Sequence, residues 1–136
     1  MYEFLKAIAA ANGWEFDYGR ADFHNLYEGV EKIIPYVFLD PVKIKDNDND
    51  SGVTESKTYS GSFMVVYSSK IDEISYDDRY QKYIKPVLDG AMDTIKTSLR
   101  CEYFATFKNW NTTEVINIFD YNFDGIICNY EIDVNI

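Results

Sequence analysis

The chain has 136 residues and a formal net charge of −10, with 23 acidic and 13 basic side chains. This length is typical of a single domain with a sizeable core. The charge disfavours tight binding to a nucleic-acid backbone or an anionic membrane, because both require clustered Lys and Arg. It is compatible with a basic partner, or with an acidic surface that DNA passes without sticking.

The chain is rich in aromatic residues, with 12 Tyr and 9 Phe, which predicts a core packed largely with rings. Its start, Met1 to Lys6, lacks the basic region and apolar stretch of a signal peptide. No run approaches the roughly 20 apolar residues of a membrane span. We therefore expect a protein that is made in a cytoplasm, has no membrane contact, and stays there or leaves as part of an assembly.

The first part of the chain predicts a helix and a short strand. Tyr2 to Asn12 carries an apolar stripe at helical spacing, and Gly13 is a suitable stop. Trp14 to Tyr18 alternates aromatic and acidic residues, which favours a strand. The stretch from Ala21 to Gly29 is ambiguous, and we interpret it as a short helix.

Two strands joined by an acidic loop are expected next. Ile33 to Lys45 is a strand region in which Pro35 and Pro41 indicate a sheet edge or an interruption by a bulge. A polar loop over about residues 46–57 has no core potential, and Thr58 to Ser69 resumes a strand. Together these segments predict a long hairpin arm with a mobile tip.

The main helix is predicted over Tyr76 to Arg100, where apolar residues recur at steps of three and four. Pro86 lies inside this pattern, so we expect a kink or a break into two pieces near it. A further strand is predicted over Tyr103 to Lys108.

The last segment fits two incompatible patterns. The first is the calcium loop of an EF-hand, with oxygen ligands at loop positions 1, 3, 5, 7 and 12 and glycine at position 6. Asp120, Asn122, Asp124 and Glu131 occupy positions 1, 3, 5 and 12. The carbonyl of Ile126 is the ligand at position 7, and Gly125 is the glycine at position 6. An EF-hand also needs a helix that begins inside the loop, so that the last glutamate clamps the ion.

The second pattern is a β-hairpin. From Ile126 to Ile136, apolar and polar residues alternate, which is the period of a strand with one buried face. On a helix these apolar residues would share no face. We favour a hairpin of Thr113–Phe119 and Gly125–Ile136, in which Asp120, Asn122 and Asp124 form a turn and Gly125 supplies a positive φ.

The order of elements predicts one α+β domain over residues 1–136. We expect a mainly antiparallel β-sheet with a long hairpin arm. A long kinked helix and the N-terminal helix would cover one face of this sheet.

Candidate catalytic or ligand-binding residues are few. The acidic loop begins Asp-x-Asp-x-Asp, but Gly52 comes one place late for an EF-hand, and Lys57 at position 12 cannot clamp calcium. His24 has no recognisable nucleophile or carboxylate partner, and Cys101 and Cys128 are expected to be buried apolar side chains. We assign no catalytic, cofactor-binding or metal-binding residue, and we predict a protein that is not an enzyme.

The chain from about Ile33 onward resembles the small neck and tail proteins of tailed bacteriophages, particularly tail terminators and related head-to-tail connector ring proteins. The resemblance lies in the order of the elements and in the general character of their sequences. The segments that carry it are Tyr36–Val42, Tyr59–Val66, Tyr80–Pro86 and Asp124–Ile132.

This resemblance implies a structural role in the virion, in a protein made in the host cytoplasm. Such proteins form homomeric rings stacked below the portal, and they cap or connect the tail around a channel for DNA. The partners implied are further copies of the chain and other neck, tail or portal proteins, while DNA passes without specific binding. A small calcium-binding module with a loop at residues 120–131 is the alternative, and it requires a helical C-terminus.

Overall fold

The computed structural model describes residues 1–19, 34–68, 75–118 and 123–136. The helices and strands, in chain order, are α1 (Tyr2–Asn12), β1 (Glu15–Tyr18), β2 (Tyr36–Leu39), β3 (Lys43–Asp48), β4 (Thr54–Ser68), α3 (Tyr76–Arg79), η1 (Tyr80–Asp89), α4 (Gly90–Cys101), β5 (Thr106–Ile118) and β6 (Phe123–Asn135). The strands form one sheet in the order β1-β2-β4-β6-β5, and β3 pairs with β4 beside β2. Apart from the parallel pair of β1 and β2, all pairs are antiparallel, so the predicted α+β class is confirmed.

The central strand is β4, which is long enough to pair with two strands along the same edge. β2 pairs with its second half, from Phe63 to Val66, and β3 pairs with its first half up to Ser60. Pro41 lies between β2 and β3, because proline lacks the N–H that a continuous strand would donate. The strand region is thus interrupted, as predicted, but by a break between two strands and not by a bulge.

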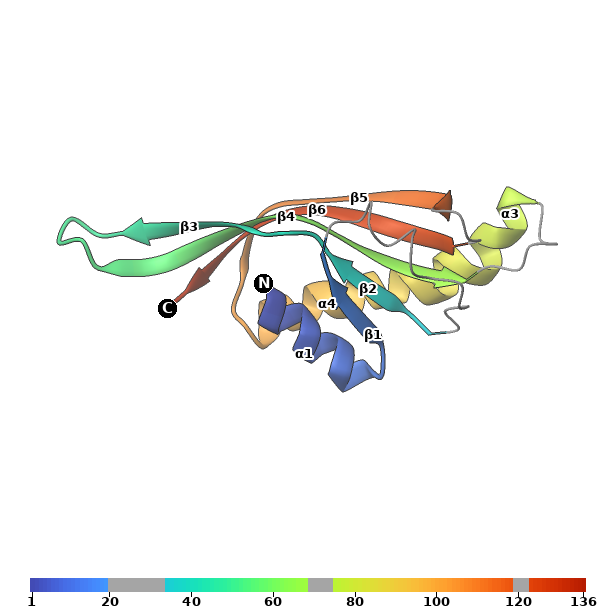
Figure 1. Cartoon of the computed structure of the whole chain (residues 1–136), viewed down its shortest axis with the longest axis horizontal. Helices are drawn as coiled ribbons and strands as arrows, with labels where there is room; N and C mark the ends of the chain where they lie inside the picture. Colours follow the sequence, from blue (N-terminus) through green and yellow to red (C-terminus); the bar gives the residue numbers. More distant parts are fainter. Residues whose placement is uncertain (20–33, 69–74, 119–122) are drawn as a thin grey trace.

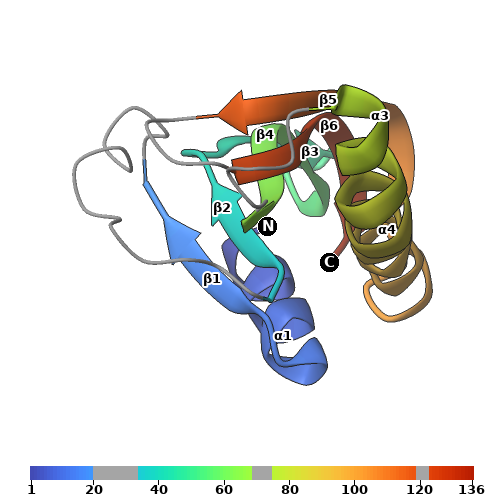
Figure 2. The same cartoon turned by 90° about the vertical axis from the view of Figure 1, so that its right-hand side faces the viewer.

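The helices cover one face of the sheet, as predicted (Figures 1 and 2). α1 ends at Gly13, whose φ of 72° is the left-handed conformation typical of a helix C-terminus. Alternate residues of β4 and β6 point to this helical layer and form the main core with it. The fully buried side chains of this core include Leu5, Leu39, Phe63, Val65, Leu88, Ile95, Leu99 and Ile132.

A second, smaller cluster lies on the opposite face of the sheet. It consists of Tyr36, Phe38, Met64, Val66 and Phe123, with Ile127 packed against it. These residues alternate with the main-core residues along β2, β4 and β6, because successive side chains of a strand point to opposite faces. Both faces of the sheet are therefore apolar where β2, the second half of β4 and the start of β6 lie side by side.

The long helix is continuous from Tyr76 to Cys101, and its middle segment η1 is a π-helix that contains Pro86. Proline cannot donate the helical hydrogen bond, and its ring collides with the carbonyl of residue i−4 in an α-helix. The wider π-helical turn accommodates this defect. The distortion expected at Pro86 thus takes the form of a π segment, and the prediction of two separate pieces is wrong.

The strand β5 replaces two predicted strands, Tyr103–Lys108 and Thr113–Phe119. The polar stretch between them remains in the sheet because it pairs with β6 along its whole length, with register shifts at Phe107/Asn109 and Ile116/Ile118. Polar side chains are acceptable there because they project from an exposed edge strand. The prediction of three C-terminal strands is therefore corrected to two.

The strand β6 confirms the hairpin interpretation of the C-terminus. Ile126, Cys128, Tyr130 and Ile132 are buried in the main core, as their alternation predicts. Gly125, however, is not a turn residue: it lies within β6, opposite Val66 and Val115. A Cβ at Gly125 would lie 2.9 Å from Cγ1 of Val66, so glycine is needed for close packing rather than for a positive φ.

A buried ion pair joins the start of the long helix to the start of β6. Nη1 of Arg79 lies 3.7 Å from Oδ1 of Asp124, and the two side chains are 4% and 0% exposed. Asp124 sits on the helix-facing side of β6, in step with Ile126 and Cys128. The residue that the sequence placed in a turn or a calcium loop therefore anchors the helix to the sheet.

We predict that Arg79→Met lowers the free energy of unfolding by about 3–5 kcal/mol, because it leaves the buried carboxylate of Asp124 without its cation. Urea denaturation followed by circular dichroism measures this change. The double variant Arg79→Met/Asp124→Val should recover most of the loss, and Lys85→Met, at an exposed helix position, serves as the control. An unchanged urea midpoint for Arg79→Met would contradict the assigned role of the pair.

Candidate functional site

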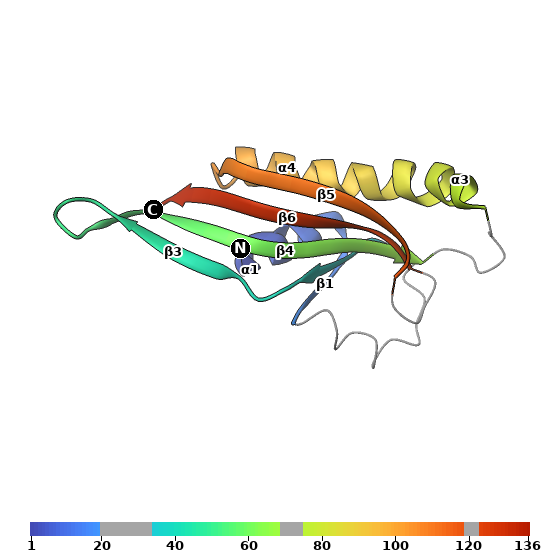
Figure 3. The same ribbon diagram turned by 90° about the horizontal axis from the view of Figure 1, so that it is seen from above.

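A β-ribbon projects from one end of the molecule, beyond the helices (Figures 1 and 3). We call residues 43–60, which comprise β3, the tip and the first half of β4, the arm. The predicted loop over residues 46–57 is much shorter in the structure, because β3 continues to Asp48 and β4 begins at Thr54. Asn49 shapes the tip, since its Oδ1 accepts hydrogen bonds from the N–H groups of Ser51 and Val53.

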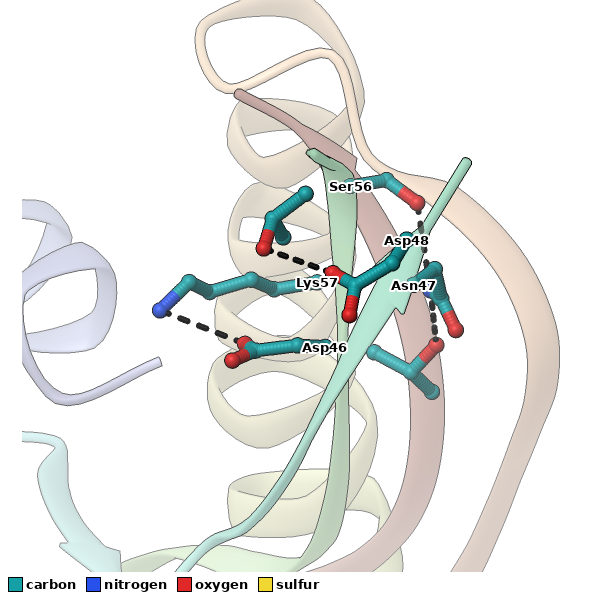
Figure 4. Close-up of polar contacts among 7 residues, drawn as sticks. Asp46, Asn47, Asp48, Ser56 and Lys57 are labelled. Carbon is teal, nitrogen blue, oxygen red and sulfur yellow. Dashed lines mark hydrogen bonds and ion pairs between the residues drawn. The ribbon is translucent and has the colours of Figure 1, made fainter. Parts of the chain in front are cut away.

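Polar contacts between side chains hold the two strands of the arm together on one face. Asp46 pairs with Lys57 at 3.4 Å, and Asp48 accepts a hydrogen bond of 2.7 Å from the hydroxyl of Thr54. Figure 4 shows Asp46 and Lys57 extending to the same side of the ribbon. Ile44, on this face too, is 57% exposed, so the arm has no apolar core of its own.

The opposite face of the arm carries a polar network that crosses four strands. Nδ2 of Asn47 on β3 donates to Oγ of Ser56 at 3.1 Å and to Oγ1 of Thr58 at 2.9 Å (Figure 4). The hydroxyl of Thr58 donates to Oδ1 of Asp133 on β6, and Nζ of Lys108 on β5 lies 2.9 Å from Oδ2 of Asp133. The network therefore ties the root of the arm to the far side of the sheet.

The charges in this network stabilise one another. The hydrogen bond from Lys108, followed by that from Thr58, lowers the pKa of Asp133 below its usual value. In return, the hydrogen bond to Asp133 raises the pKa of Lys108. The pair is thus ionised throughout the neutral pH range and holds the bulged start of β5 against β6.

The outer part of the arm is strongly acidic. From Asp46 to Ser56, which we call the acidic tip, four carboxylates and no Lys or Arg occur. The carboxylates are Asp46, Asp48, Asp50 and Glu55. Every residue of β3 except Asn47 is exposed, so these charges face solvent.

The opposite edge of the sheet is open. β5 pairs with β6 on one side, and no strand of the described chain pairs with its other side. Residues from Asn111 to Glu114 are exposed in the middle of this edge. A long edge strand of this kind presents unpaired N–H and C=O groups that another strand can join.

Three cations surround the first part of β5. Nζ of Lys96 on α4 lies 5.5 Å from the ring of Phe107 and 5.7 Å from that of Trp110, and the Arg100 guanidinium lies 5.8 Å from the ring of Phe107. Lys108 lies on the other face of the strand, beside Asp133. We call Lys96, Arg100 and Lys108 the cationic rim, because they flank the open edge from both faces.

A shallow cleft of about 410 Å³ continues along this side of the molecule, between α4 and the sheet. Its lining contains two carboxylates one helical turn apart, Asp89 and Asp93, together with Lys96 and Trp110. Neither a histidine nor a cysteine is among its lining residues. The cleft offers charge and an aromatic surface, which suit contact with another chain.

Two described ligand residues of the alternative calcium loop, Asp124 and Glu131, lie on opposite faces of the strand β6. Asp120 and Asn122 lie outside the described residues, and Asp124 is paired with Arg79. Glu131 lies within β6, opposite Ser60 and Asn109, so the helix that would swing it round to an ion is replaced by a strand. Within the described residues, no group of three or more His, Cys, Asp or Glu side chains is placed to hold a metal ion.

The remaining candidates are a histidine and two cysteines. His24 and the predicted helix around it lie outside the described residues. Cys128 is buried, and burial raises the pKa of its thiol to about 12. Cys101, in contrast, is exposed at the end of α4, so the prediction that it is buried is wrong.

The polar network and the cationic rim were not predicted from the sequence. Thr58 and Asp133 are 75 residues apart in the chain, and Lys96 meets Phe107 and Trp110 across a turn between helix and strand. No local spacing signals either arrangement. A local signal existed for the acidic tip alone, in the concentration of acidic residues between Asp46 and Glu55.

The chain matches no protein-family model, and comparison with curated proteins gives no match. Within the described residues, no helix is long and apolar enough to cross a membrane. The function is therefore inferred from the arm, the open edge and the charges around them.

We predict that the stability advantage of the wild type over Asp133→Asn is present at pH 7 and shrinks as the pH falls below about 4. The folded-state pKa of Asp133 is lowered, so its contribution is present above the unfolded value of about 3.9 and is lost as the pH falls through the folded value. Urea denaturation of both proteins at pH 7 and at pH 3 measures the difference. Asp93→Asn, on the exposed face of α4, is the matched control, and a difference that is independent of pH would contradict the prediction.

We also predict that the native protein reacts with a thiol reagent at Cys101 alone. Burial keeps the Cys128 thiol protonated and out of reach, so it should react when the protein is unfolded in urea. A colorimetric thiol assay of the native and unfolded protein, with Cys101→Ser as the control, checks this. Rapid reaction of Cys128 in the native state would contradict the burial of β6.

Proposed function

We propose that this protein is a structural subunit of the neck or tail of a tailed bacteriophage, and that it forms a homomeric ring around the DNA channel. The observation that carries the proposal is the arm, a β-ribbon that extends beyond the body of the molecule with its β3 residues largely exposed. Beyond Ser56, where β4 no longer pairs with β6, the arm has two strands only, and a two-stranded ribbon is marginally stable by itself in water. A chain that holds such a ribbon away from its own core presents it to another molecule.

The position of the arm supports assembly into a ring. The arm lies on the β3 side of the sheet, while the open edge lies on the β5 side. When two different surfaces of a subunit contact each other between copies, the contact is head-to-tail, and it closes into a ring where the rotation allows. A symmetric dimer would instead use one and the same surface on both copies.

The charge of the chain supports a place beside DNA. A net charge of −10 repels the phosphate backbone, so DNA passes along such a surface without being retained. The resemblance of the element order to tail terminators and head-to-tail connectors points to the same role. In this proposal the subunit performs no catalytic step, and its neighbours are other neck, tail or portal proteins of the virion.

We predict that the purified full chain forms closed rings of uniform size, visible by negative-stain electron microscopy and by native mass spectrometry. A shortened variant replaces residues 46–57 with a two-residue Asn-Gly turn, which connects Lys45 to its cross-strand partner Thr58. This variant should remain folded, because the removed residues lie outside the main core. It should also fail to form rings.

Circular dichroism melting of the shortened variant provides the folding control for this experiment. Rings that form equally well without the arm would show that the arm is not the assembly element. A chain that stays monomeric at every concentration, alone and mixed with the neighbouring virion proteins, would overturn the proposed function.

A further inference from the structure

The cationic rim is unusual in a chain with a net charge of −10. Lys96 and Arg100 lie one turn apart on α4 and approach the ring of Phe107 from the helical side of the sheet. Lys108 occupies the register shift of β5 and points to the other side, where it meets Asp133. The open edge of β5 is thus flanked by positive charge on both faces.

This arrangement fits an acidic strand better than other anions. The edge of β5 supplies backbone N–H and C=O groups in the spacing of a strand, and a polypeptide can satisfy both kinds of group. A nucleic-acid backbone has acceptors to offer but no matching row of donors. The rim would then hold carboxylates that project from the added strand toward the helical face of the sheet, where Lys96 and Arg100 lie.

The acidic tip of the arm has these properties. It consists of two extended strand ends joined by a turn, with Asp46 and Asp48 on β3, Asp50 in the turn and Glu55 on β4, and it has no basic residue between them. The tip cannot reach the β5 edge of its own chain, because β4 and β6 lie between the two edges of the sheet. The contact is therefore possible between two copies and not within one.

We propose that the acidic tip of one copy docks along the open edge of β5 in a second copy, between Lys96 and Arg100 on the helical face and Lys108 on the other. The inference rests on the proposed ring and names the contact that closes it. Lys108 is shared with Asp133, so Lys96 and Arg100 supply most of the new attraction. Their present contacts are with aromatic rings, which leave N–H donors available to a carboxylate.

Charge exchange between two variants tests this contact. The rim variant is Lys96→Glu/Arg100→Glu, and the tip variant is Asp48→Lys/Asp50→Lys. Each variant alone places like charges opposite each other and should weaken self-association by at least about tenfold. When the two variants are mixed in equal amounts, each tip faces a rim of opposite charge, and association should return as alternating assemblies.

Sedimentation velocity at low and at high salt, with each variant alone and mixed, provides the measurement. Lys6→Glu/Lys85→Glu makes the same charge change at two exposed sites away from the rim, so it should associate like the wild type. Circular dichroism melting shows whether each variant is folded. Recovery on mixing further excludes misfolding as the cause of the loss.

The outcomes separate the contact from the ring itself. Rings in the wild type that persist in both variants would overturn the docking of the tip on β5 and leave the proposed function intact. Loss of rings in both variants without recovery on mixing would also overturn this contact. A wild type that never associates, alone or with the neighbouring virion proteins, would overturn the contact and the proposed function together.

Discussion

The structure depends on the antiparallel pairing of β4 with β6, which runs without a shift from Ser56 opposite Asn135 to Ser68 opposite Phe123. In this register, the odd-numbered residues of β4 and the even-numbered residues of β6 point to the helices. The even-numbered residues of β4 and the odd-numbered residues of β6 point to the opposite face. A slip by one residue would turn every apolar side chain of one strand to the wrong face. The same pairing carries β4 past the helices and so creates the root of the arm.

The helical layer ends before the sheet does, and the way the strands are held together changes at that point. Over the body, large side chains such as Phe63 and Leu88 are fully buried, and apolar packing dominates. Beyond it, Asn47, Thr58 and Asp133 connect neighbouring strands through hydrogen bonds. A polar network gives less stability than a core, but it keeps an exposed ribbon in one geometry and leaves its surface available for contact with another molecule.

Much of the fold was predictable because its signals are local. The helix α1, the strands β1 and β4, the long helix and the alternation of β6 all follow from apolar spacing at 3.6 or 2 residues. The errors arose where pairing overrides local preference. Two polar segments have the composition of loops: the middle of β5, and the end of β3 from Asp46 to Asp48. Hydrogen bonds to a neighbouring strand nevertheless hold each of them in the sheet. Pro86 is retained in a continuous helix by a π-helical segment.

The sequence by itself determined the class of the fold, the acidic character of the arm and the buried face of the last strand, because composition and periodicity act between near neighbours. The tertiary structure decided what the charged side chains do. It moved Asp124 from a turn or an ion site to a buried pair with Arg79, and it brought Lys96 to Phe107 at the open edge of β5. These contacts join segments that are distant in the chain, and their geometry depends on strand order and register, which no short stretch of sequence encodes.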